Sequence, residues 1–575
     1  MTERPHAQRN GLICAAIFAA CFLLAWPFAE MGFIDDWSYV KSAQVFAETG
    51  RLTYNGWAAP MLGWQVAWGG LFIRLFGFSF TSVKLATFPV AILTLILFHA
   101  VLVRFGITAR NAIFGTLTLG LSPLFLPLSA SFLTDIYGLF AVVLCLYCCQ
   151  RALASHGSAS MIAWLSIAAV SSVLGGTARQ TAWLGALVMM PSTAWLLRKR
   201  RGALLAAAVL WGGSFACISY CGHWLTKQPY ARPGMTSILG LVKAFDHIRL
   251  ASLRDLVGLV LFLILLVYPI LVGSLPRIGK IGRPALIVIA CILAPWTLFQ
   301  WYFKWTLPWT SDLFLQMFSP GRNPTAVSDL REFILPLPAR LVLSLLIIGT
   351  AMVFVAAVLA ELRNPECAAA STPWREVFWL FAPFTLSCFA LLLLLALDDI
   401  AVIDRYVLVF LPLAIVCLIR LHQQWLAPNL PRSSAVLLVI YAVLAITATH
   451  DWFAWQRARL IAIDEVRSSG VPPTAIAGGL EYRGWTQIEN GGHINSLWVT
   501  NPPGTYQTSL EIPPVADGCK MFFSHLMPAV RPHYAVAFSR IPCTQPSNYP
   551  PVSYLAWLPP FHRTVDVQEI PWLKQ

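Results

Sequence analysis

The feature that most constrains this chain is a series of apolar runs without charge, many of them about 17–22 residues long. A helix of that length crosses the ~30 Å hydrocarbon core of a bilayer. A period of two between apolar and polar residues, as in a membrane β-barrel, is not visible. The sequence therefore predicts a polytopic α-helical membrane protein with about thirteen transmembrane helices. The runs lie at about 11–29, 82–103, 111–128, 136–150, 161–177, 181–197, 203–221, 255–274, 284–300, 338–359, 377–397, 402–420 and 433–449.

The composition excludes a large soluble surface. Only 11% of the 575 residues are charged and 58% are hydrophobic, whereas an average soluble domain is about 25% charged. The net charge of +14 would suggest a nucleic-acid partner in a soluble protein. The densest basic cluster, Arg198 to Arg201, lies between two apolar runs, so we interpret it as a topology signal and expect no nucleic-acid partner.

Basic residues also predict the orientation. If the runs alternate across the membrane, every loop on one side contains Lys or Arg, as the positive-inside rule requires. This places the N-terminus in the cytoplasm and the C-terminus outside. The first run could instead be a signal peptide, but Glu30 and the residues after it offer no small-x-small cleavage site. The basic residues of the inside loops are Arg104, Arg110, Arg151, Arg198 to Arg201, Arg277, Lys280, Arg283, Arg363, Arg375, Arg420 and Arg432.

The chain divides into two parts. Residues 1–450 form the predicted transmembrane domain, with residues 30–80 as a long first outside loop that carries surface helices, among them a helix over 36–48 ended by Gly50. Residues 451–575 are less apolar and rich in turn signals, which predicts a small outer domain, α/β or mostly β. A disulfide between Cys519 and Cys543 fits an oxidising compartment.

Carboxylates are scarce, and three of them lie at predicted outer ends of spans. Asp35 and Asp36 directly follow the first run, and Asp135 begins another. Each could be no more than a helix cap or a first-turn acid. Carboxylates close to the hydrocarbon are nevertheless costly, which makes them candidates for function.

Three cations oppose the positive-inside bias and lie on the same predicted face. They are Lys84, Arg179 and Arg405. Lys84 could simply extend its ammonium to the interface, and Arg405 could pair locally with Asp404 or Asp398. Together with the carboxylates, they are the groups needed at a lipid phosphate: cations stabilise the phosphate as a leaving group, and a carboxylate accepts the proton of an attacking nucleophile.

In this order and on one face, these residues resemble the GT-C superfamily of polytopic glycosyltransferases. The nearest groups are family 39 and the RgtA/B/C/D-like enzymes, related to protein O-mannosyltransferases and aminoarabinose transferases. The carriers of the resemblance are the acidic pair Asp35-Asp36, Lys84 at the start of the second span, Asp135, the segment 177–182 around Arg179, and Arg405-Tyr406. The resemblance covers about residues 10–420 and implies a GT-C fold with an outer C-terminal domain.

The resemblance also implies roles. It predicts a glycosyltransferase that moves a sugar from a polyprenyl-phosphate donor to a glycan, lipid or protein acceptor on the outer face, with inversion. Asp35 or Asp36 would be the catalytic base, with Asp35 favoured, and Asp135 a further member of the catalytic group. Lys84, Arg179 and Arg405 would bind the donor phosphate. No cofactor is implied with certainty; a divalent metal is left open, although no metal ligand is assigned.

The location implied by the resemblance is a bacterial inner membrane. The alternative function is a transporter or flippase of a lipid-linked saccharide, which would place charges near the middle of its spans.

Overall fold

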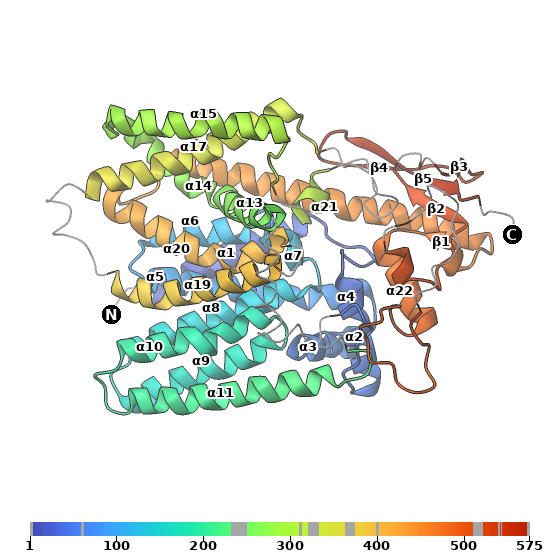
Figure 1. The fold of residues 1–575 in the computed structure, drawn as a ribbon, viewed down its shortest axis with the longest axis horizontal. Helices are drawn as coiled ribbons and strands as arrows, with labels where there is room; N and C mark the ends of the chain where they lie inside the picture. Colours follow the sequence, from blue (N-terminus) through green and yellow to red (C-terminus); the bar gives the residue numbers. More distant parts are fainter. Residues whose placement is uncertain are drawn as a thin grey trace.

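The computed structural model describes residues 4–58, 62–231, 250–309, 313–319, 333–362, 374–397, 402–509, 521, 523–538, 541 and 543–571. Within them the chain is a bundle of helices followed by a small C-terminal unit with a sheet (Figure 1). All of the predicted apolar runs contain helical structure, which confirms the helical fold class.

Eight of the described helices are long and apolar enough to cross a membrane, or nine if the bent pair Arg254–Leu266 and Tyr268–Lys280 is one span. Other runs give shorter pieces, such as α6 (Ala109–Gly120) followed by α7 (Phe125–Ser129). The number of about thirteen spans therefore stays a prediction. The eight long helices are Phe80–Arg104 (α4 and α5), α8 (Thr134–Leu153), α9 (Ser158–Gly176), α11 (Ala203–Thr226), α15 (Arg283–Phe303), α17 (Leu337–Leu362), α19 (Arg375–Leu397) and α21 (Arg432–Ser468).

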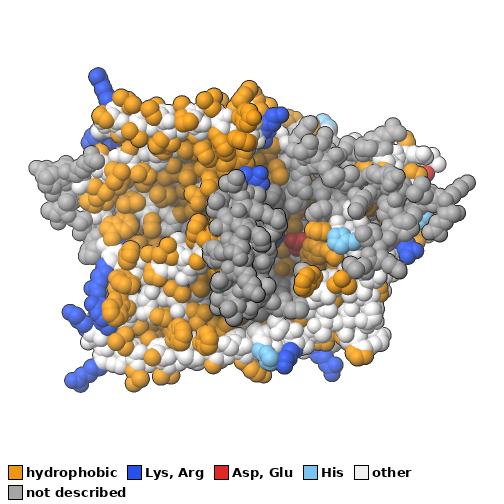
Figure 2. Space-filling view, in the orientation of Figure 1, with side chains coloured by type: hydrophobic (Ala, Val, Ile, Leu, Met, Phe, Trp, Pro, Cys, Tyr) orange, Lys and Arg blue, Asp and Glu red, His pale blue; other side chains and the backbone are white. Residues whose placement is uncertain are grey.

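On the face of the bundle shown in Figure 2, hydrophobic side chains predominate and charged side chains are rare away from its ends. Only 11% of the most apolar stretch of α11 and 6% of that of α15 are buried inside the protein. Exposed apolar area of this extent is unfavourable in water. Lipid is the medium that covers it at no such cost, so the surface fits a protein that spans the bilayer.

The first loop contains the expected surface helices, α2 (Asp36–Thr49) and α3 (Trp64–Phe76). Gly50 ends α2 as predicted: with a φ of 69° it adopts the left-handed conformation, and its N–H bonds to the carbonyl oxygen of Phe46. The long loop is therefore an ordered layer that packs on the end of the bundle (Figure 1).

The C-terminal unit is α/β, one of the two predicted classes. Its short strand β1 (Ile476–Ala477) pairs in parallel with β2 (Tyr534–Ala537). Helix α22 (Leu480–Gly491) follows β1. Three strands pair antiparallel with the last strand β5 (His562–Glu569): β2, β3 (Gln545–Pro546) and β4 (Val552–Leu555).

Of the two cysteines expected to pair in this unit, Cys543 is disulfide-bonded. Cys519 lies outside the described residues. The proposed pairing between them therefore stays a prediction.

Helix α21 joins the two parts. Its 37 residues extend ~55 Å at 1.5 Å per residue, well beyond the ~30 Å hydrocarbon core. It continues as one helix through residues 450 and 451, so the expected boundary falls within a helix, and the division into domains at that point stays a prediction. Figure 1 shows α21 running from the bundle to the sheet.

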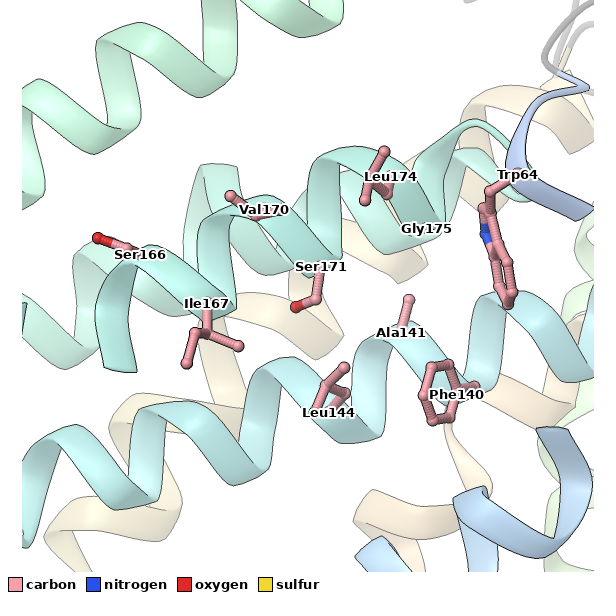
Figure 3. Close-up of a pocket in the computed structure, with 10 residues that line it drawn as sticks. All are labelled: Trp64, Phe140, Ala141, Leu144, Ser166, Ile167, Val170, Ser171, Leu174 and Gly175. Carbon is pink, nitrogen blue, oxygen red and sulfur yellow. The ribbon is translucent and has the colours of Figure 1, made fainter. Parts of the chain in front are cut away.

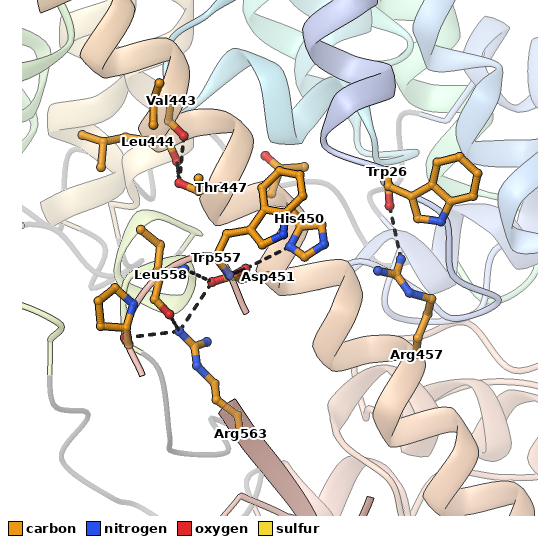
Figure 4. Close-up of polar contacts among 12 residues, drawn as sticks. Trp26, Val443, Leu444, Thr447, His450, Asp451, Arg457, Trp557, Leu558 and Arg563 are labelled. Carbon is orange, nitrogen blue, oxygen red and sulfur yellow. Dashed lines mark hydrogen bonds and ion pairs between the residues drawn. The ribbon is translucent and has the colours of Figure 1, made fainter. Parts of the chain in front are cut away.

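Asp451 attaches the β4–β5 hairpin to α21 (Figure 4). Its carboxylate accepts the backbone N–H groups of Trp557 at 2.6 Å and Leu558 at 2.9 Å. Arg563 Nη2 lies 3.4 Å from Oδ2 of Asp451, and the ring of His450 stacks on Trp557 at 3.8 Å. The carboxylate is 4% exposed, so its partners compensate for lost hydration.

Asp451→Ala is expected to lower the stability of this attachment by about 3 kcal/mol, because the N–H groups of Trp557 and Leu558 lose their acceptor and the guanidinium of Arg563 loses its opposite charge. Limited proteolysis of the hairpin and the Tm of the purified protein measure the effect. The matched control is Asp464→Ala on the same helix, which removes an exposed pair with Arg467 and should leave both unchanged. Equal protection of the hairpin in both variants would contradict the assignment.

Candidate active site

Four of the six predicted site residues meet at one end of the bundle. Arg405 Nη2 lies 3.3 Å from Asp35 Oδ2, and Arg405 Nη1 lies 3.6 Å from Asp135 Oδ2. Arg179 Nη1 lies 2.8 Å from Asp135 Oδ1. We call Asp35, Asp135, Arg179 and Arg405 the ion cluster. Its members are separated by up to 370 positions along the chain, so the fold and not local sequence brings them together.

Asp35 is the accessible carboxylate of the ion cluster. It precedes the first residue of α2 but makes no capping hydrogen bond with its side chain. The carboxylate accepts from Trp57 Nε1 at 3.1 Å through Oδ1, which leaves Oδ2 toward Arg405. Its side chain is 26% exposed. Asp35 is therefore held by side chains at a surface that a small molecule can reach.

Asp135 is the buried carboxylate. It lies in the first turn of α8 and its side chain is 1% exposed. Burial of a lone charge is expensive, and the two guanidiniums of Arg179 and Arg405 offset that cost. Asp135 therefore fixes the two arginines relative to each other.

The two arginines come from short irregular segments. Arg179 lies between α9 and η1 (Gln180–Ala182), donates to Thr134 Oγ1 at 3.2 Å, and places its guanidinium 5.3 Å from the ring centre of Tyr406. Arg405 lies in η5 (Asp404–Val409).

A local pair of Arg405 with Asp404 or Asp398 was the alternative to a role in the site. The carboxylate of Asp404 accepts the backbone N–H groups of Leu313 and Phe314, at 3.3 and 2.7 Å, at the start of α16 (Leu313–Met317). Asp398 lies outside the described residues. Arg405 itself reaches the two carboxylates of the ion cluster.

Asp36 does not belong to the ion cluster: it is completely buried, and its hydrogen-bond partners are backbone N–H groups. Its carboxylate accepts the N–H of Phe33 at 2.5 Å and that of Phe132 at 3.0 Å. Phe132 belongs to the turn just before α8. Asp36 thus connects the loop of Asp35 to the turn of Asp135.

Lys84 does not lie in the ion cluster either. It is buried, and its ammonium donates to the carbonyl oxygens of Ala29 and Met31 at 2.9 and 2.7 Å. Those carbonyls belong to the turn that leads to Asp35. In this structure Lys84 shapes that turn, and its predicted contact with a phosphate stays a prediction.

Two further residues of the site, Tyr39 and Gly138, were not predicted from the sequence. Tyr39 lies one turn after Asp35 on α2, and burial together with the Asp35 carboxylate raises the pKa of its phenol to about 12, while the charges of the other three cluster members also affect this pKa. Gly138 lies one turn after Asp135; a Cβ there would come within 2.7 Å of the Arg179 side chain. Tyr39 is four residues after Asp35, and Gly138 is three residues after Asp135. Residues at these spacings lie close together along a helix, which is the sequence signal that could have predicted both.

An apolar groove of about 430 Å³ opens beside the cluster between α8 and α9 (Figure 3). Trp64 lies at one end of the groove, and its backbone N–H donates to Thr177 Oγ1 at 3.3 Å, two residues before Arg179. The groove walls are α8, which carries Asp135 in its first turn, and α9, which ends three residues before Arg179. The groove is lined by Trp64, Phe140, Ala141, Leu144, Ser166, Ile167, Val170, Ser171, Leu174 and Gly175.

No group of three or more His, Cys, Asp or Glu side chains in the described part of the chain is placed to hold a metal ion. Both carboxylates of the ion cluster pair with Arg405. The sequence left a divalent metal open without assigning a ligand to it, and these contacts do not test it.

Neither the family models nor the curated proteins give a match to this chain. Among solved structures, the yeast S. cerevisiae protein O-mannosyltransferase Pmt1-Pmt2 matches with a TM-score of 0.33 and 14% identity, over 38% of this chain and 33% of that one. ArnT of Cupriavidus metallidurans bound to undecaprenyl phosphate matches with a TM-score of 0.36 and 14% identity, over 82% of this chain and 83% of that one.

The oligosaccharyltransferase of Archaeoglobus fulgidus, in complex with Zn and sulfate, matches with a TM-score of 0.45 and 14% identity, over 92% of this chain and 67% of that one. Identities and TM-scores this low do not assign a function to this chain, so its function has to be inferred from its own site.

Asp36 gives a pH-dependent test of the site geometry. Loss of hydration on burial raises the pKa of its carboxyl from 3.8 to about 6, against the opposing charge of Lys84. Because the folded state binds this proton more tightly than the unfolded chain, the group stabilises the fold at low pH, and this contribution is lost as the pH rises from about 4 to about 6. The loss is on the order of 3 kcal/mol.

Asp36→Asn removes the titration. The Tm of the wild type relative to that of Asp36→Asn, measured from pH 4 to pH 7, should therefore fall with rising pH. Parallel Tm curves for the two proteins would contradict the burial of an ionisable Asp36.

Proposed function

We propose that this chain is a membrane glycosyltransferase that moves a sugar from a polyprenyl-phosphate donor to an acceptor. The observation that supports this most is the ion cluster beside an apolar groove. A ligand that fills both must have a long apolar chain attached to an anion, which is the chemistry of a polyprenyl phosphate. The site lies at the end of the bundle that carries the C-terminal unit, which on the predicted orientation is the outer face.

Donor binding is assigned to the two arginines and the groove. Arg179 and Arg405 provide two planar guanidiniums, which suit the oxygens of a phosphate. Their side chains are 20% and 10% exposed. The isoprenoid chain lies between α8 and α9, with Trp64 at the end nearest the phosphate.

Asp35 is the catalytic base. An oxygen or nitrogen of the acceptor attacks the anomeric carbon of the sugar and forms a new bond to it. The bond from that carbon to the phosphate oxygen breaks, and its electron pair leaves with the phosphate, where Arg179 and Arg405 stabilise the charge. The proton of the acceptor passes to Asp35. A single displacement of this kind inverts the anomeric carbon.

The other three predicted site residues are positioning residues. Asp135 holds Arg179 and Arg405, while Asp36 and Lys84 shape the turn that presents Asp35. The acceptor is a glycan, a lipid or a protein, and the membrane is a bacterial inner membrane with the N-terminus in the cytoplasm. The alternative, a flippase of a lipid-linked saccharide, needs no base at Asp35.

Asp35→Asn is expected to lower sugar transfer by about 100-fold or more, since the proton acceptor is lost. The assay uses membranes supplied with labelled polyprenyl-phosphate sugars, at matched protein level. Glu48→Gln is the control, because Glu48 is an exposed carboxylate on the same helix α2 and should transfer at the wild-type rate.

Transfer that survives Asp35→Asn would remove Asp35 as the base. Movement of the intact lipid across the bilayer, without transfer by the wild type, would favour the flippase.

Filling the groove should weaken donor binding selectively. In Ser171→Trp the indole occupies the groove, so the KM for a long-chain donor should rise about tenfold or more while kcat changes little. A donor with a short isoprenoid should respond less. Ile162→Trp is the control, since Ile162 is exposed on the same helix and does not line the groove. Equal effects on long and short donors would contradict the assignment of the groove to the lipid.

A further inference from the structure

A second cavity, of about 640 Å³, lies at the opposite end of the bundle from the ion cluster. Helix α8 runs from one site to the other: its first turn contains Asp135 of the ion cluster, and its last residue, Leu153, lines the second cavity. Its 20 residues extend ~30 Å, the thickness of the hydrocarbon core. The two sites therefore open at opposite surfaces of the membrane.

The charge of this second cavity is strongly unbalanced. Its lining contains five basic side chains and one carboxylate, an excess of four positive charges. The basic residues come from segments that are distant in sequence: helix ends carry Arg104, Arg375 and Arg420, and the turn before α11 carries Lys199 and Arg200. Lys and Arg side chains stand at that end of the molecule in Figure 2. The charged residues of the lining are Arg104, Lys199, Arg200, Arg375, Arg420 and Glu376.

The positive-inside rule explains why basic residues lie at this surface, but it does not require them to converge on one cavity. Several are also held in place. Arg200 Nη2 donates to the carbonyl oxygen of Leu153 at 3.1 Å. The Arg104 guanidinium lies 5.3 Å from the ring centre of Tyr147, and that of Arg420 lies 4.9 Å from the ring centre of Trp374. Like charges held around one space repel each other unless an anion lies between them.

The lining also has an apolar side. Phe105, Leu153, Leu196 and Leu197 share the cavity with the cations. A cavity that is basic and apolar, at the end of membrane-spanning helices, matches a headgroup at the membrane surface whose acyl chains continue along the helices.

We infer that this cavity binds a phosphate group, and that the source that fits it is the headgroup of an anionic phospholipid in the leaflet at this end. The chemistry shared with free phosphate is an anion with several acceptor oxygens, for which arginine clusters are suited. The inference is independent of the proposed sugar transfer, because it concerns the other surface and a different ligand.

The test measures binding of phosphatidylglycerol to the full purified chain in neutral detergent by native mass spectrometry, with phosphatidylcholine as the zwitterionic comparison that carries no net charge. A separate arm measures the change in Tm with inorganic phosphate or pyrophosphate. The cavity variant is Lys199→Gln with Arg375→Gln, two exposed lining residues. The control is Arg198→Gln with Arg201→Gln, which removes the same charge from the same basic run outside the lining.

Phosphatidylglycerol should bind the wild type more tightly than phosphatidylcholine. It should bind the cavity variant on the order of 30-fold more weakly than the wild type, at about a fivefold loss per basic residue. The control variant should bind within about twofold of the wild type, because Arg198 and Arg201 do not line the cavity. Glu376→Gln should strengthen binding, since it removes the opposing charge of the lining.

Stabilisation by inorganic phosphate without lipid binding, lost in the cavity variant alone, would keep the anion site and assign its source to free phosphate. Equal losses in the cavity and control variants would overturn the inference, because they indicate diffuse surface charge. Failure of every anion to bind would overturn it as well. None of these outcomes depends on transferase activity.

Discussion

The candidate active site depends on one arrangement, the Arg405 guanidinium between the carboxylates of Asp35 and Asp135. Close to the hydrocarbon, a charge is costly unless an opposite charge and hydrogen bonds replace its water. Arg405 can meet that requirement only if the first loop, the start of α8 and η5 lie together. Arg179 then completes the balance around Asp135 and adds the end of α9.

Helix α21 supports the same loop from the other side. Arg457 Nη1 donates to the carbonyl oxygen of Trp26 at 3.2 Å (Figure 4) and to that of Phe28 at 2.9 Å. Gln456 Nε2 donates to the carbonyl oxygen of Gly32 at 2.6 Å. The turn before Asp35 is therefore held by Lys84 on one side and by α21 on the other. Because α21 also carries the sheet, the C-terminal unit and the candidate base share one rigid support.

Much of this could be predicted from the sequence, and the reasons are physical. Apolar runs and basic loops are direct consequences of the bilayer, so they predict the helical fold class. The surface helix after Asp35 could be predicted from local sequence, because Gly50 marks its end. The scarcity of charge drew attention to Asp35, Asp135, Arg179 and Arg405. The roles of Asp35 and Asp36 differ because of their tertiary contacts. The sequence of two adjacent aspartates does not show that Asp36 accepts the N–H of Phe132 whereas Asp35 pairs with Arg405. The same holds for Lys84, whose partners are backbone carbonyls 53 and 55 positions away.

The most direct measurement is a cryo-EM map of the purified full chain with a polyprenyl phosphate added. Phosphate density within hydrogen-bonding distance of both Arg179 and Arg405, with the isoprenoid chain between α8 and α9, is the expected result. It would place the reacting bond next to Asp35. Phosphate density elsewhere, with Arg405 still paired to Asp35 and Asp135 and the groove empty, would contradict the proposed donor site.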